Sequence, residues 1–107
     1  MRTMEEHHFY VSVAKEVGVH AAILFYNITY WIRKNKANEA NFRDGKWWTY
    51  NSVKAFQELF PYLTEKQIRT ALKKLIDGGW IIVGEYNSSS FNHKKWYALT
   101  QKGEQFL

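Results

Sequence analysis

Six polar side chains between positions 64 and 77 have the types and the spacing of a surface that contacts nucleic acid. At about 100° per residue, three of them lie opposite the apolar side of a helix and three lie on its flanks. The six are Lys66, Thr70 and Lys73 on the outward face, with Gln67, Arg69 and Lys74 on the flanks. Arg, Lys and Gln donate to base edges and phosphates when a helix enters a major groove. The N-terminal end of this helix, at Thr64, could receive a further phosphate. The segment predicts a recognition helix for duplex DNA, and the alternative is an ordinary solvated helix face.

A small, polar segment at positions 87–95 separates two β-rich stretches. Its candidate contact residues are Ser89, Asn92, His93, Lys94 and Lys95. Small side chains let the backbone approach a sugar-phosphate strand, and the two lysines supply charge. His93 is mostly neutral at pH 7 and adds a hydrogen-bond donor. The segment predicts a wing that touches DNA, and the alternative is an ordinary flexible loop.

Other residue types with chemical potential favour structural roles. The tryptophans at 47, 48, 80 and 96 could stack on unpaired bases, but alternation along a strand favours core packing and places one of Trp47 and Trp48 inside. The pair His7-His8 lies beside two glutamates but lacks a third metal ligand at helical spacing. The chain has no cysteine and no phosphate-binding glycine loop or nucleophile motif. We therefore expect neither an enzyme nor a bound cofactor or metal.

The candidate recognition helix has clear start and stop signals. Thr64 and Gln67 have the spacing of a capping box, in which each side chain bonds to the other residue's backbone amide. Gly78-Gly79 ends the helix, because glycine adopts the left-handed conformation required there. Its apolar side is expected to bury Ile68, Ala71, Leu72, Leu75 and Ile76.

A longer helix is expected over residues 19–35, preceded by a short helical turn over 12–17 that Gly18 ends. One broad apolar stripe contains Ala21, Leu24, Phe25, Ile28, Trp31 and Ile32. A second, partly aromatic stripe contains Ile23, Tyr26 and Tyr30. Two apolar stripes predict a helix that is central in the domain or forms a homodimer interface.

Another helix is predicted from an Asn51 N-cap to about Leu59, with Pro61 stopping it. Its inward side chains would be Val53, Phe56, Leu59 and Phe60. Strands are expected at 47–50, 80–86 and 94–99, the first beside a hairpin of the other two. A final helical turn over 100–107 would be folded back by Phe106.

Composition limits the function classes. The 107 residues suit one domain, and 46% hydrophobic with 18% aromatic residues exclude a disordered tail. The net charge of +5 favours an acidic partner such as nucleic acid. No signal peptide or membrane span is visible, so we expect a cytoplasmic protein without a membrane partner.

The order of helix, strand, helix, turn, helix and hairpin is that of a winged helix-turn-helix. We therefore predict an α+β, mostly α fold: one winged helix-turn-helix DNA-binding domain over residues 1–107, with a small three-stranded antiparallel sheet. The recognition helix over 64–77 would enter the major groove. The wing over 87–95 would contact the backbone or the minor groove.

Several stretches resemble the N-terminal winged-helix domain of replication proteins from phages and mobile elements of Gram-positive bacteria. The resemblance covers about residues 9–100, and its most specific part is Asp44-Gly45-Lys46-Trp47-Trp48. It also includes the segments 21–32, 49–52, 60–61, 64–69 and 72–75. It implies a replisome-organiser-like protein that binds origin DNA and recruits helicase-loading proteins. Such proteins usually have a further C-terminal region.

Two other functions are compatible with the same elements. A winged-helix transcriptional regulator would use the same DNA-binding surface. A protein-interaction module would instead use the aromatic helix over 19–35 as its contact surface. The first hypothesis remains a duplex DNA-binding protein that acts in replication initiation or its control.

Overall fold

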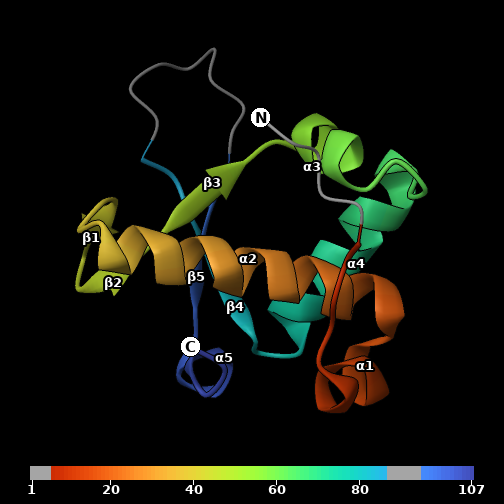
Figure 1. Ribbon diagram of the computed structural model, residues 1–107, viewed down its shortest axis with the longest axis horizontal. Coiled ribbons are helices and arrows are strands. Elements are labelled where there is room, and N and C mark those ends of the chain that lie inside the picture. Colours follow the sequence, from red (N-terminus) through yellow and green to blue (C-terminus); the bar gives the residue numbers. More distant parts are fainter. Residues whose placement is uncertain (1–5, 87–94) are drawn as a thin grey trace.

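The longest helix, α2 (Val19–Ala37), crosses the structure, and the other elements pack around it (Figure 1). The computed structural model describes residues 6–86 and 95–107. The remaining helices are α1 (Val11–Val17), α3 (Val53–Leu59), α4 (Glu65–Asp77) and α5 (Gln101–Glu104). Helix α4 packs against α2, and α1 and α3 pack beside these two. The fold is α+β and mostly helical, as predicted at this level.

Local signals explain where the helices begin and end. The capping box of α4 forms: the Thr64 hydroxyl accepts from the Gln67 amide at 3.1 Å, and Gln67 Oε1 accepts from the Thr64 amide at 2.9 Å. Gly79 alone takes the left-handed conformation at the end of α4, because φ is +76° there and −78° at Gly78. The prediction of Asn51 as the N-cap of α3 is wrong. Ser52 is the cap, and its hydroxyl accepts from the Ala55 amide.

Two small antiparallel sheets replace the single sheet that was expected. Strands β1 (Phe42–Arg43) and β2 (Lys46–Trp47) form a short hairpin that the sequence analysis did not predict. Its two-residue turn has positive φ at both Asp44 and Gly45, which suits strands that twist in the right-handed sense. The expected strand over 47–50 is therefore interrupted at Trp48.

The three-stranded sheet has the predicted partners. Its strands are β3 (Thr49–Asn51), β4 (Ile81–Gly84) and β5 (Lys95–Leu99), in the order β3-β5-β4. Tyr50 pairs with Trp96, and Ile82 pairs with Ala98. Strand β5 is central and has both faces covered. The β3 strand thus lies beside the β4–β5 pair, as expected.

The core lies mainly between α2, α4 and one face of the sheet. Tyr97 and Leu99 of β5 point into this core, and Trp96 and Ala98 point into a second, smaller cluster. Trp48 is buried in the smaller cluster, whereas Trp47 is half-buried against the main core. This agrees with the expectation that one of these two tryptophans points inward.

Three apolar residues that were expected to face the core are exposed instead. They are Trp31, Leu59 and Ile76. Each lies at the edge of its helix's apolar stripe, so the helix rotation that buries Ile28, Phe56 and Leu75 leaves it at the surface.

Candidate nucleic-acid interface

The outward face of α4 carries the polar side chains that the sequence predicted there. Thr64 and all six side chains of the face and its flanks are exposed, whereas Ile68, Ala71, Leu72 and Leu75 are buried. At about 1.5 Å per residue, the 13 residues of α4 span about 20 Å. The helix thus offers one continuous polar side to a partner.

Two of the four cations of α4 have carboxylate partners on the same helix. Arg69 lies 3.5 Å from Glu65, and Lys73 lies 2.7 Å from Asp77, both at i,i+4 spacing. Lys66 and Lys74 have no carboxylate partner among the described residues. The positive charges of Lys66 and Lys74 are therefore uncompensated. The ion pairs of Arg69 and Lys73 are exposed and hence weak.

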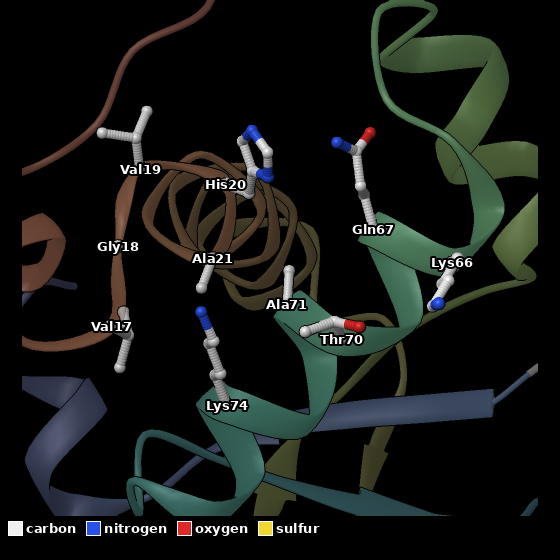
Figure 2. A pocket seen from close by; sticks show the side chains of 10 residues that line it. All are labelled: Val17, Gly18, Val19, His20, Ala21, Lys66, Gln67, Thr70, Ala71 and Lys74. Carbon is white, nitrogen blue, oxygen red and sulfur yellow. The ribbon is translucent and has the colours of Figure 1, made fainter.

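A surface hollow of about 310 Å³, here named the basic hollow, lies along one flank of α4. Its other wall is the junction where α1 ends and α2 begins (Figure 2). Gly18 makes this junction possible, because its φ of +88° is one that side chains rarely adopt. The hollow is lined by Val17, Gly18, Val19, His20, Ala21, Lys66, Gln67, Thr70, Ala71 and Lys74.

The basic hollow has positive electrostatic character. None of its ten lining residues is acidic, and Lys66 and Lys74 supply charge. Figure 2 shows the Lys74 amine directed toward the α1–α2 junction. A Cβ atom on Gly18 would lie 4.0 Å from Lys74 Nζ. An anion in the hollow would therefore meet cations from α4 and the imidazole ring of His20.

Only one of the predicted wing residues can be located. Lys95 begins β5 and is exposed. Ser89, Asn92, His93 and Lys94 lie outside the described residues. The predicted contact of the wing with DNA therefore stays a prediction.

The start of the β4–β5 connection is tied to the β1–β2 hairpin. The Tyr86 hydroxyl donates to the Asp44 carboxylate, and this hydrogen bond is the main cause that raises the pKa of Tyr86. The Arg43 guanidinium lies 5.4 Å from the centre of the Tyr86 ring and 5.6 Å from that of Trp96. Arg43 thus holds a positive charge where the wing begins.

Two residues of this surface were not predicted. His20 reaches the basic hollow only through the packing of α2 against α4, which no local pattern encodes. Arg43 lies in β1, and its basic residue type was the only signal that the sequence offered. His20 and Arg43 thus lie next to predicted contact residues.

The N-terminal His7 contacts side chains elsewhere in the same chain. His7 Nδ1 lies 2.7 Å from the Tyr62 hydroxyl, and the His7 ring packs 4.5 Å from that of Phe60. Burial, with a smaller effect of His8, lowers the pKa of His7. Within residues 6–86 and 95–107, no group of three or more His, Asp or Glu side chains could hold a metal ion.

The second aromatic stripe of α2 is partly covered by the chain itself. Ile23 packs against the core, and the Tyr26 ring lies 5.2 Å from that of Tyr10. Tyr30 is exposed.

Among the described helices, α2 included, none is long and apolar enough to cross a membrane.

Comparison of the chain with protein-family models, with curated proteins and with solved structures found no match.

Proposed function

We propose that this chain is a winged helix-turn-helix protein that binds duplex DNA, with α4 in the major groove. The observation that carries the proposal is the segregation of α4 into a buried apolar side and an exposed side. The exposed side bears Lys66, Arg69, Lys73 and Lys74. A recognition helix needs this arrangement, because its inner side must be held rigidly while its outer side donates to bases and phosphates.

The surroundings of α4 support the same role. Helices α3 and α4 follow each other across a short turn, as in a helix-turn-helix. The basic hollow adjoins the outward face, so a backbone phosphate at the groove edge would meet Lys74 and Lys66. Arg43 and Lys95 would place further charge beside the wing. The proposed interface thus combines base contacts from α4 with backbone contacts on either side.

The biological setting rests on the family resemblance of the sequence. We place the protein in phage or mobile-element replication, where it would act in initiation or its control. Helicase-loading or other replication proteins would then be its partners. A transcriptional regulator would use the same surface, and a selection of bound sequences from a random duplex pool separates the two. Enrichment of replication-origin sequences supports the first role, and enrichment of promoter sequences supports the second.

The binding itself is tested by the salt dependence of affinity for mixed-sequence duplex. Each neutralised phosphate contributes a slope of about −0.9 to log K against log salt. Four contacts from α4 would therefore give a slope of about −3.6 and a loss of about a hundredfold over a fourfold rise in salt. Replacing Lys66 and Lys74 together with alanine should remove about half of this slope.

Lys36→Ala is the matched control, since this exposed lysine lies at the opposite end of α2 from the basic hollow. It should keep the slope unchanged, and every variant should keep its melting temperature, because exposed positions contribute little to stability. Absence of duplex binding at low salt would refute the proposal. That result would favour a protein-interaction module that uses exposed Tyr30 on α2.

A further inference from the structure

A second surface hollow of about 320 Å³ lies between α2, β3 and α3, and we name it the asparagine hollow. Four of the seven asparagines of the chain line it: Asn27 and Asn35 of α2, Asn41 of the following loop and Asn51 of β3. No lining residue is charged. Three successive parts of the chain thus bring neutral amide groups to one place, with a volume that suits a small organic group.

These amides retain hydrogen-bonding capacity. The Asn35 amide donates one bond to the Trp48 carbonyl at 2.9 Å, which leaves its oxygen as an acceptor. Asn51 Oδ1 accepts from the Ser52 amide, which leaves its NH₂ group as a donor. The side chains of Asn27 and Asn41 make no hydrogen bond within the described part of the chain. All four are half-buried, so a ligand in the hollow would meet both donors and acceptors.

The hollow also has an aromatic wall and an apolar interior. Ile28 and Phe56 line it and are buried, whereas Trp31 lines it with 38% of its surface exposed. Trp31 is the most exposed of the five tryptophans, all of which lie in the described residues. A flat, neutral group with donors and acceptors on its edge fits such a lining.

A cation lies next to the aromatic wall. Lys34 Nζ is 5.4 Å from the centre of the Trp31 ring, and Lys34 has no carboxylate partner among the described residues. The segment 19–50 has five basic and two acidic side chains, so its net charge is +3. Of these five cations only Arg43 belongs to the proposed duplex interface, so that interface does not explain most of this charge.

We propose that the asparagine hollow binds a base of single-stranded nucleic acid. The base would stack on Trp31 and bond through its edge to the asparagine amides, while an adjoining phosphate meets Lys34. Nucleobases carry both donors and acceptors on a flat ring, and stacking on an aromatic side chain is the usual mode of single-strand binding. A duplex cannot supply such a base, because its bases are stacked and paired inside the helix.

This site is separate from the α4 part of the duplex interface, whereas its Asn51 pairs with Lys95 at the wing. His20 lies at the basic hollow and Trp31 at the asparagine hollow, so the two are about 16 Å apart along the axis of α2. The inference goes beyond the proposed function and does not depend on it. Variants of α4 should leave binding in the asparagine hollow unchanged, and Trp31→Ala should leave duplex binding by α4 unchanged.

The test uses the whole chain, isotope-labelled for nuclear magnetic resonance, with a short oligothymidylate as the probe. We expect the side-chain NH₂ signals of Asn27, Asn35, Asn41 and Asn51 to shift on titration. Inorganic phosphate alone should not move them. Unmoved asparagine signals at saturating oligothymidylate would overturn the proposal, as would equal shifts with phosphate alone.

Variants then assign the roles. Trp31→Ala should weaken oligothymidylate binding by between about fivefold and about a hundredfold, and Trp31→Tyr should restore most of it, because a ring remains for stacking. Lys34→Gln should lower the salt slope by about 0.7, the value for one phosphate of a single strand. Lys36→Gln and Tyr62→Ala are matched controls, since both residues are exposed and neither lines the hollow.

Duplex affinity is measured on the same proteins. It should be unchanged in Trp31→Ala and reduced in the double Lys66 and Lys74 variant. Full oligothymidylate affinity in Trp31→Ala would overturn the single-strand proposal, whatever happens to duplex binding. Loss of duplex binding by the lysine variants would leave it standing.

Discussion

Replacing Asp77 with asparagine should raise the affinity for duplex DNA. Asp77 lies in the last turn of α4, and its carboxylate is 2.7 Å from Lys73 Nζ on the outward face. A phosphate bound by Lys73 would thus have a negative charge as its neighbour. Both side chains of the pair are mostly exposed, so this repulsion is moderated by water but not removed.

The size of the effect follows from the geometry of the pair. A phosphate oxygen bonded to the Lys73 amine at about 2.8 Å would lie about 5.5 Å from the Asp77 carboxylate when the three groups are in line. In water, two unit charges at this distance repel by about 0.8 kcal/mol. Removing the carboxylate charge should therefore increase affinity about threefold to fourfold at low salt.

The same substitution should hardly change the free energy of unfolding. Losing the exposed i,i+4 pair costs about 0.3–0.5 kcal/mol. However, a carboxylate at a helix C-terminus interacts unfavourably with the helix dipole by a similar amount, and that interaction is also lost. A change in affinity would therefore reflect the interface and not the stability of α4.

Fluorescence anisotropy with a labelled duplex measures this effect. Glu39→Gln is the control with the same change of net charge, because Glu39 follows the end of α2 that lies opposite α4 (Figure 1). It should raise affinity by much less than Asp77→Asn. Equal gains from the two variants would show that only net charge matters and would refute placing Lys73 at the phosphates.

Three further predictions concern the scaffold that holds α4. A Cβ on Gly103 would lie 2.4 Å from the Trp80 carbonyl oxygen, so Gly103→Ala should lower the free energy of unfolding by about 1–3 kcal/mol in urea. Gly45→Asn, in open space with a tolerated left-handed backbone, should change it far less. Burial raises the pKa of Tyr97 from 10.0 to about 12. The native protein should thus lose stability as the pH rises from about 10 to about 12, and Tyr97→Phe should lose less. Thr64→Ala should cost about 1 kcal/mol by removing the N-cap, and Thr64→Ser should restore it, as thermal melting would report.

Patterns that act within a few residues were reliable in this chain. The capping box at Thr64 and the glycines after Asp77 predicted the bounds of α4 closely, because both signals satisfy the backbone groups of the helix itself. The exchange of Asn51 for Ser52 as a cap shows the limit of this reasoning. Both residue types cap helices, and only the backbone path after β3 decides which of them is at the N-cap position.

Features that depend on packing could not be read from the sequence. The basic hollow exists because α1 and α2 meet at Gly18 beside α4, and His20 carries no local mark of this. The asparagine hollow likewise unites residues from α2, β3 and the loop between them. Helical periodicity placed Trp31 among the core residues, because it cannot tell the centre of an apolar stripe from its edge.

The number of cations at the duplex interface bears on how many copies bind. The described residues supply Lys66, Lys74, Lys95 and Arg43 without a carboxylate ion pair, and the other two cations of α4 have one. A protein that makes six to ten phosphate contacts has the strong salt dependence of a specific regulator, so one copy falls near the lower end of this range. Two copies on half-sites about one helical turn apart would double the contacts. Because Tyr10 already covers part of the aromatic stripe of α2, we expect such pairing to occur on DNA rather than in free solution. A monomer in sedimentation that binds a duplex two to one would fit this expectation, and a stable free dimer would contradict it.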